Sequence, residues 1–199
     1  MTAVVAEKGY AATTVADVVR RARVSRRAFY ESYADKEACF VAACQAGYDA
    51  VIAQIRTATR AVPLEALPPA RLRAATRAYL QFMTEEPEYA RTMLIEVVGA
   101  GPLALQGRSR VRQEFAAMTR AWHEKARSVY PSYPPVPPSA YTAMVAAIYG
   151  LVAARVAEGD TEHLVELEEE IDYVQLVVFA GHAVADAELP GVAEAASFS

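Results

Sequence analysis

Apolar residues recur along most of this chain at steps of three and four, the spacing that gathers them on one face of an α-helix. No stretch shows the strict alternation of apolar and polar residues that is typical of a half-buried strand. Prolines and glycines separate the helical stretches and set the ends of the predicted helices. The pattern predicts an all-α fold with helices at about Thr2–Lys8, Thr14–Ala22, Ser25–Ser32, Asp35–Ala61, Ala70–Glu85, Glu88–Val98, Leu105–Tyr130, Ser139–Glu158 and Glu162–Ala187.

Two proline-rich segments punctuate this pattern. Pro63–Pro69 separates the N-terminal helices from a larger C-terminal part, and Pro131–Pro138 predicts an extended loop. We expect a DNA-binding head at residues 1–48, a ligand-binding and dimerisation body at residues 49–199, and a frayed tail from Leu189 onward.

The composition fits a folded protein, since 54% of the 199 residues are hydrophobic and only 22% are charged. The apolar stretches are shorter than the roughly 20 residues that span a bilayer, and the start lacks a secretory signal. We therefore expect a cytoplasmic protein without a membrane partner. The net charge is −4, but residues 20–36 carry six basic and two acidic side chains and hence +4. A basic patch at one end of an acidic body is typical of a protein that meets phosphate in one region, although a solvated arginine-rich face has the same charge.

Residues 14–33, which overlap this basic patch, predict two short helices joined by a tight turn, which is the helix-turn-helix arrangement. Three side chains of the first helix should point inward, Val24 should plug the turn, and two aromatic side chains of the second helix should complete the small core. The inward set is Val15, Val18, Val19, Val24, Phe29 and Tyr33. The second helix of such a unit enters the major groove, where the arginine fork can pair with guanine. We expect Arg26, Arg27 and Tyr30 on its outer side, with Thr14, Tyr30 and Lys36 near phosphates.

The stretches Gly9-Tyr10-Ala-Ala-Thr13-Thr14-Val15-Ala-Asp17-Val18, Val24-Ser25, Phe29-Tyr30 and Tyr33-Ala-Asp-Lys36-Glu37 together resemble the TetR (tetracycline repressor) family. The resemblance covers about forty residues in type and spacing. It implies an all-helical homodimer with a three-helix head that binds double-stranded operator DNA and a divergent body that binds a small-molecule effector. By position, Arg26 to Ala28 match the base-reading stretch of the family. The resulting candidate DNA contacts are Thr14, Ser25, Arg26, Arg27, Ala28, Tyr30 and Lys36.

Three features depart from the family pattern. Arg23 stands where glycine is usual in the turn, at a cost of about 1 kcal/mol if the left-handed conformation is required. Ser32 stands where an aromatic residue or histidine is common. The first helix begins at Met1, so either the true start lies upstream or the head is less well supported.

Aromatic and methionine side chains at helical spacing in the body predict either plain core packing or the wall of an apolar pocket. Glu96 and Arg155 are polar residues in apolar surroundings, which could orient a ligand, pair with a charge or face solvent. The candidate ligand-binding residues are Tyr79, Phe82, Met83, Met93, Glu96, Phe115, Met118, Trp122 and Arg155.

No catalytic constellation, metal site or cofactor is expected. Cys39 and Cys44 lie five positions apart, which turns them away from each other on a helix, and each is interpreted as a packing residue. The three histidines are scattered along the chain.

The last two predicted helices offer two apolar sides for a homodimer. One consists of Tyr141, Met144, Ala147, Ile148, Leu151 and Val152, and the other of Ile171, Val174, Gln175, Val178 and Phe179. We expect a DNA-binding repressor that a small, largely apolar ligand releases from its operator. The alternatives are a helical regulator or adaptor that has lost DNA binding and acts through protein contacts, and an all-helical enzyme.

Overall fold

The structure is a computed structural model that describes residues 1–63 and 65–192. Every regular element in these residues is a helix, and none of them lies in a strand, which confirms the predicted all-α fold. The elements are α1 Thr2–Lys8, α2 Val15–Ala22, α3 Arg26–Ser32, α4 Lys36–Ala61, α5 Pro68–Glu85, α6 Pro87–Leu94, η1 Glu96–Gly99, α7 Pro102–Val129, α8 Pro138–Ala157, η2 Leu164–Leu167, α9 Glu168–Phe179 and α10 His182–Glu188.

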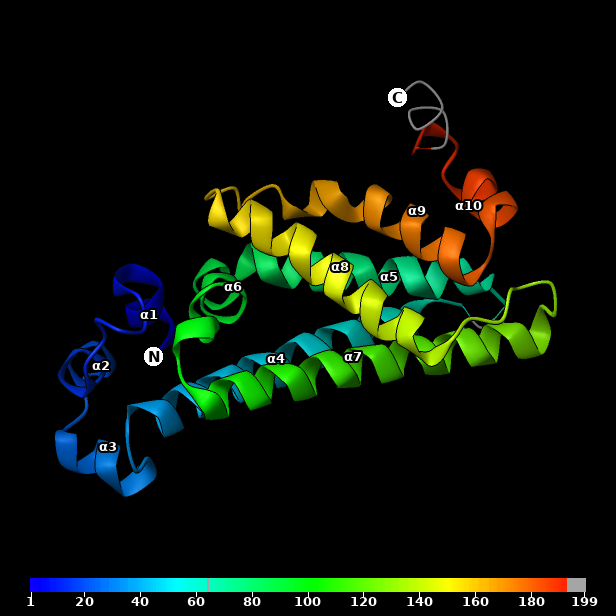
Figure 1. Cartoon of the computed structure of the whole chain (residues 1–199). Helices are drawn as coiled ribbons and strands as arrows, with labels where there is room; N and C mark the ends of the chain where they lie inside the picture. Colours follow the sequence, from blue (N-terminus) through cyan, green and yellow to red (C-terminus); the bar gives the residue numbers. More distant parts are fainter. Residues whose placement is uncertain (64, 193–199) are drawn as a thin grey trace.

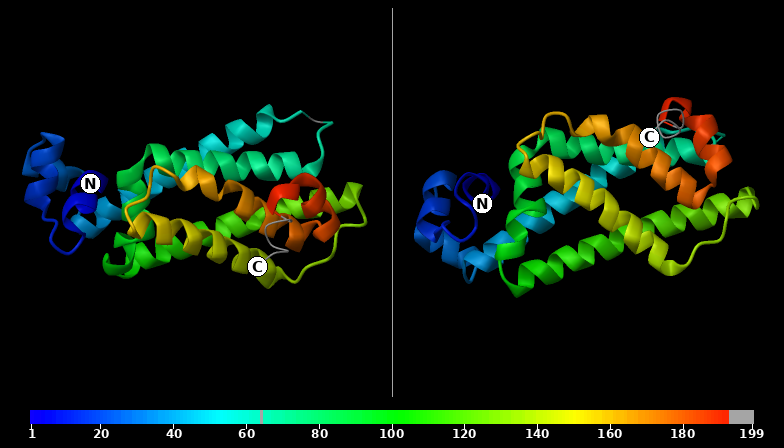
Figure 2. Two further views of the ribbon diagram at one scale, coloured as in Figure 1. Left: turned by 90° about the horizontal axis from the view of Figure 1, so that it is seen from above. Right: turned by 45° about the horizontal axis from the view of Figure 1, so that its top comes forward.

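The helices form a small head and a longer body (Figure 1). Helices α1, α2 and α3 gather at one end, and the long helix α4 leads from this head into the body, where it packs against α5 and α7. Helix α7 runs beside α4, while α8 and α9 lie on the side of α5 and α7 away from α4 (Figure 2). This arrangement confirms a helix-turn-helix head followed by a helical body.

Proline determines where several helices begin. Helices α5, α7 and α8 start at Pro68, Pro102 and Pro138, each one to three residues before the start that the apolar pattern predicts. The first helical position suits proline because its amide has no partner within the helix and its fixed φ is already helical.

The prediction of one helix over residues 162–187 is wrong. The chain forms the short turn η2, then α9, and breaks before α10 at Gly181, whose φ is 94°. Glycine adopts this left-handed region at little cost, so the chain turns there. The frayed tail does not begin at Leu189, which is only 5% exposed; residues 193–199 of that predicted tail lie outside the described part of the chain. The helix predicted at Glu88–Val98 likewise ends early, at Leu94, and continues as η1.

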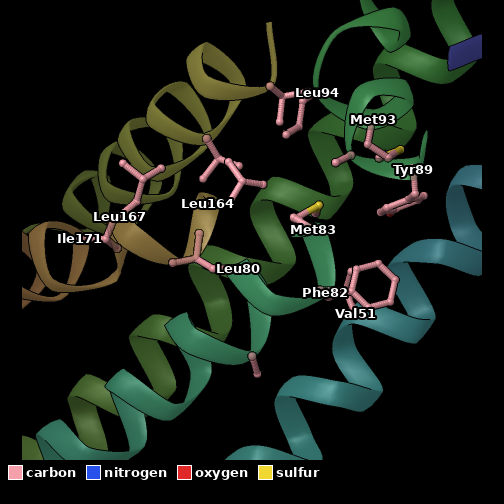
Figure 3. Packing of buried hydrophobic residues seen from close by; sticks show 14 of the residues in the cluster. Val51, Leu80, Phe82, Met83, Tyr89, Met93, Leu94, Leu164, Leu167 and Ile171 are labelled. Carbon is pink, nitrogen blue, oxygen red and sulfur yellow. The ribbon is translucent and has the colours of Figure 1, made fainter. Parts of the chain in front are cut away.

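The main core of the body joins residues from six elements (Figure 3). Val51 of α4, Leu80 of α5 and Tyr89 of α6 are buried in it, together with Val152 of α8 and Ile171 of α9. Burial of this apolar surface stabilises the body at about 25 cal/mol for each Å² removed from water.

Most residues of the two apolar sides proposed for dimerisation are buried within their own subunit. Tyr141, Met144, Val152, Ile171, Gln175 and Phe179 are each less than 9% exposed. They therefore cannot form the contact with a partner, and that part of the prediction is wrong. The residues of these helices that do face outward include Leu151 and Val174, which are 43% and 48% exposed.

By length and composition alone, α4 and α8 are apolar enough to cross a membrane. In the structure, 33% of the most apolar window of α4 is buried, and Val51, Ile52 and Ile55 of α4 are buried side chains. The corresponding window of α8 is 22% buried, which leaves an exposed apolar side on that helix.

Candidate nucleic-acid interface and ligand cavity

The start of α2 is fixed by a reciprocal cap. The Thr14 hydroxyl accepts a hydrogen bond from the Asp17 amide at 3.2 Å and donates to the Asp17 carboxylate at 2.7 Å. Lys8 at the end of α1 donates to the same carboxylate at 2.9 Å. The hydrogen bonds from Thr14 and Lys8 lower the pKa of Asp17 well below its usual range. The cap therefore ties α1 to α2 and leaves Thr14 exposed beside the N-terminus of α2.

Arg23 occupies the turn between α2 and α3 in the left-handed conformation, with φ 56° and ψ 38°. It is the one non-glycine residue with positive φ among the described residues. The turn thus requires the left-handed conformation at a residue that is not glycine. Val24 does not plug the turn, since it is 48% exposed. The space beneath the turn is already filled by Val18, Val19 and Phe29, so Val24 projects into solvent.

Helix α3 separates an inward aromatic side from an outward basic side. Phe29 is 5% exposed and packs with Val18, Val19 and Cys39, and Tyr33 lies against this cluster, as predicted. On the outer side, Tyr30 is 57% exposed.

The N-terminal turn of α3 carries the outward arginines. The Ser25 hydroxyl accepts from the Ala28 amide at 3.0 Å and so caps the helix. Arg26 is exposed and makes no ion pair with another described residue. Arg27 pairs with Glu31 at 2.9 Å, but both side chains are largely exposed, so this pair is weak and can open.

Lys36 lies at the junction of the head's helices. Its ammonium group donates to the carbonyl oxygens of Tyr10 and Thr13 at 2.8 and 2.9 Å and sits 4.1 Å from the centre of the Tyr10 ring. Two of its three donors therefore hold the loop between α1 and α2. The predicted phosphate contact of Lys36 stays a prediction and would use the remaining donor.

The head is joined to the body by hydrogen bonds as well as by packing. The Glu96 carboxylate in η1 accepts from the Tyr10 amide at 3.0 Å, and the Glu37 carboxylate accepts from the Leu103 amide at 3.0 Å. The prediction that Glu96 contributes to a ligand pocket is wrong, because its carboxylate faces the head and lies 3.7 Å from Arg91.

The body contains a cavity of about 440 Å³, within the range of roughly 300–1,000 Å³ that is typical of small-molecule sites. It lies between α4, α5, α6, α7, α8 and α9, and its wall is mostly apolar. Six of the predicted pocket residues line it, namely Tyr79, Met83, Met93, Phe115, Met118 and Trp122. That these side chains contact a ligand stays a prediction.

Besides Glu96, two further predicted pocket residues lie outside the cavity wall. Phe82 packs in the core against Tyr89, with ring centres 5.6 Å apart, and does not line the cavity. Arg155 pairs with Asp160 at 2.6 Å and lies 3.8 Å from Glu166, near the end of α8. Their placement in the pocket is therefore wrong.

The sequence prediction missed the polar residues of the cavity wall. Tyr48 and Tyr149 line it, as do Arg56, Arg71, Arg108 and Arg112. A signal for two of them was present, because the stripe of Phe115, Met118 and Trp122 continues toward the N-terminus of α7 through Arg112 and Arg108 at steps of three and four.

Tyr149 connects the cavity to the segment that contacts the head. Its hydroxyl donates to the Leu94 carbonyl at 2.7 Å, with the Met93 carbonyl at 3.1 Å as a second acceptor. These carbonyls end α6, and η1 with Glu96 follows directly. A residue of the cavity wall is thus linked through α6 and η1 to the Tyr10 amide of the head.

Comparisons with known proteins agree with these two parts. Residues 2–43 match the model of the bacterial regulatory proteins of the tetR family. The search of curated proteins found no match to the sequence. The fold is similar to that of the fatty acid degradation regulator FadR from Bacillus halodurans, with 14% identity, a TM-score of 0.78, and coverage of 88% of this chain and 93% of that one.

Two further solved structures share the fold. FadR from Bacillus subtilis, in complex with stearoyl-CoA, is 13% identical with a TM-score of 0.77, covering 90% of this chain and 94% of that one. A tetR-family regulatory protein from Rhodococcus RHA1 is 21% identical with a TM-score of 0.66, covering 89% and 92%. The head, at residues 2–43, thus carries the sequence signature of the tetR family of bacterial regulatory proteins, and the chain as a whole has the fold of these solved regulators.

Proposed function

We propose that the protein is a cytoplasmic transcriptional repressor that a small, largely apolar ligand releases from its operator. The observation that carries this proposal is the outward side of α3, where Arg26, Arg27 and Tyr30 are exposed next to a capped and packed helix-turn-helix. A recognition helix needs this combination of a rigid inner side and free basic side chains, because the groove is read by the outer side.

The DNA contacts divide into two kinds. Arg26 and Arg27, with Ser25 and Ala28 beside them, lie in the first turn of α3 or at its cap and are proposed to read base edges. Thr14, Tyr30 and Lys36 are proposed to contact phosphates, which position the head without reading sequence. The exposed Thr14 at the N-terminus of α2 is well placed for this, since helix N-termini attract anions.

A homodimer is proposed through the outward faces of α8 and α9. Leu151 and Val174 are exposed large apolar side chains on these helices, and Ala143, Ala147, Gly150 and Ala154 of α8 are exposed on the same side as Leu151. Covering such a face requires a partner, and a second copy of the chain would also present two α3 helices to successive major grooves about 34–36 Å apart.

The ligand is proposed to enter the cavity of the body. The apolar wall suits a hydrocarbon chain, and the stearoyl-CoA bound by the Bacillus subtilis neighbour supports a ligand with such a chain. The ligand acts only if it binds the DNA-free state more tightly than the DNA-bound state. The hydrogen bonds from Tyr149 to the end of α6 and from Tyr10 to Glu96 connect the cavity wall to the head, so a bound ligand could displace the head through them.

Selection of duplexes from a random pool tests the proposal without knowledge of the operator. We expect the purified protein to enrich a palindromic sequence whose half-sites are separated by one helical turn or a multiple of it. Replacement of Arg26 by Ala should relax the preference at one position of each half-site by about tenfold or more. Failure of the wild-type protein to enrich any sequence would overturn the DNA-binding proposal and favour a regulator that acts through protein contacts.

A further inference from the structure

The wall of the cavity is strongly positive although the body as a whole is acidic. Residues 63–199 carry 11 basic and 18 acidic side chains. Among the described residues that line the cavity, by contrast, no aspartate or glutamate occurs, while four arginines do, namely Arg56, Arg71, Arg108 and Arg112. A purely apolar ligand would not need these four arginines in the cavity wall.

Two of these arginines form a pair on α7. The guanidinium carbons of Arg108 and Arg112 lie 4.4 and 5.6 Å from the centre of the Tyr149 ring, so both side chains converge on one tyrosine of the wall. Both are partly buried, and neither forms an ion pair within the described part of the chain. The Nε of Arg108 is buried and has no hydrogen-bond partner there.

Arg110, which lies between these two arginines in the sequence, has a different environment. Arg110 points away from the cavity, where it hydrogen-bonds Gln45 at 2.6 Å and lies 3.8 Å from the Glu114 carboxylate. The same stretch of helix therefore supplies a paired arginine on the surface and two unpaired ones in the cavity. Because arginine does not lose its proton, burying it without an anion costs free energy that a bound anion would recover.

The other two arginines of the wall are less suited to hold an anion. Arg56 is exposed to solvent, where water screens its charge. Arg71 is engaged with the carbonyl oxygen of Val62 at 3.5 Å.

We propose that the ligand carries an anionic group that Arg108 and Arg112 bind together, while its apolar chain lies against Tyr79, Phe115 and Met118. The proposal rests on the function proposed above and narrows its ligand to an anionic amphiphile. The anionic group is either the carboxylate of a free long-chain acid or a phosphate-bearing carrier joined to an acyl chain. Either group accepts the forked hydrogen bonds that guanidinium donates.

Direct binding to the full-length protein, without DNA, tests this proposal separately from DNA recognition. The single tryptophan, Trp122, lines the cavity, so its fluorescence reports occupancy. Three probes are titrated: hexadecanoate and hexadecanoyl-CoA below their critical micelle concentrations, and hexadecan-1-ol below its solubility limit. We expect at least one of the two anions to bind tenfold or more tightly than the alcohol, which shares the chain but lacks the charge. The anion that binds more tightly shows whether the site prefers a carboxylate or a phosphate-bearing carrier.

Arginine variants on α7 test which side chains bind the anionic group. Arg108→Gln and Arg112→Gln should each weaken the anion about tenfold and leave the alcohol unchanged, whereas Arg108→Lys should retain part of the preference. Arg110→Gln removes the same charge from the same helix outside the cavity and should bind like the wild type. Circular dichroism establishes that each variant is folded.

Equal binding of the alcohol and both anions, absence of binding by all three probes, or an unchanged anion affinity in the folded Arg108→Gln, Arg112→Gln double variant would overturn the proposal. Duplex selection by the ligand-free protein is unaffected by these outcomes, so failure of the ligand proposal and failure of the DNA-binding proposal give different results.

Discussion

Arg23 is held at φ 56° in the turn on which the geometry of the head depends. An L-residue in this region brings its Cβ close to the following carbonyl oxygen, which costs about 1–2 kcal/mol, and glycine avoids that contact. The strain persists because the Arg23 amide and the Val24 amide both return hydrogen bonds to the end of α2, and because Phe29 anchors α3 on the other side.

Replacement of Arg23 by Gly should therefore stabilise the protein by about 1 kcal/mol, measured as the free energy of unfolding in urea. Arg23→Ala is the matched control, since it removes the same side chain and charge but keeps the Cβ. We expect the glycine variant to be the more stable of the two. Equal stability of the two variants would show that the backbone at Arg23 is unstrained.

Asp172 of α9 is fully buried, and neither carboxylate oxygen has a hydrogen-bond partner in the described part of the chain. Arg73 lies 3.8 Å away, which is too far for a hydrogen bond. Burial raises the pKa of Asp172 from 3.8 to about 7, with the nearby Glu168 carboxylate acting in the same direction. At a pH between these two pKa values, Asp172 is protonated in the folded protein and ionised in the unfolded chain. The free energy of unfolding therefore falls as the pH rises through this range.

Replacement of Asp172 by Asn removes this titration while keeping the size of the side chain. Between pH 4 and pH 8, the unfolding free energy of the wild type should fall relative to that of the variant, by at most about 4 kcal/mol. Urea unfolding of both proteins at equal concentration over this pH range measures the shift. A difference that does not vary with pH would mean that Asp172 is ionised normally in the folded state.

At the scale of elements, α6 and η1 form the link between cavity and head. Tyr149 holds the end of α6, and Glu96 in η1 holds the Tyr10 amide at 3.0 Å. A hydrogen bond to a charged acceptor contributes about 1.5–3 kcal/mol, so this contact is a substantial part of the junction.

Glu96→Ala should loosen the junction, which hydrogen exchange can detect at a single amide. The Tyr10 amide should exchange at least tenfold faster in the variant than in the wild type, because its acceptor is lost. Glu88→Ala on α6 is the control, since Glu88 is exposed and lies 3.9 Å from its nearest cation, Arg21. Similar Tyr10 exchange in both variants would argue against Glu96 as the link.

The apolar period predicted most helices because it is a local property of the sequence. The helices predicted at Thr14–Ala22 and Asp35–Ala61 lie within one residue of α2 and α4, since the signals for both are local in the sequence. The break at Gly181 was missed because glycine inside an apolar stretch can also continue a helix. Phe82, Glu96 and Arg155 were misplaced for another reason: their neighbours come from other elements, which a single helix does not reveal.

At the scale of the whole molecule, α8 has an exposed apolar side that no other element of the same subunit covers in the described part of the chain. Leu151 is 43% exposed there, and the window around it is among the most apolar of the chain. The sequence could not separate this outward side from the inward one, because α8 is apolar almost all round and both sides satisfy the same pattern.

Leu151→Glu should dissociate the dimer proposed through α8 and α9, because it places two like charges at the proposed apolar interface. Leu105→Glu is the matched control: Leu105 is equally exposed at 43% but lies on α7. Sedimentation equilibrium should give the mass of a monomer for the first variant and of a dimer for the second and for the wild type. A wild-type monomer, or a dimer that survives Leu151→Glu, would contradict the proposed interface.

The central claim is that the outer side of α3 binds DNA, and fluorescence anisotropy with a labelled duplex from the selection tests it most directly. The ligand-free wild type should bind saturably, with an affinity that falls steeply as salt rises, because basic side chains displace counterions from phosphates. Arg26→Ala and Arg27→Ala should bind the selected and a scrambled duplex more equally than the wild type does. Absence of salt-dependent binding by the wild type to any selected duplex would contradict the account.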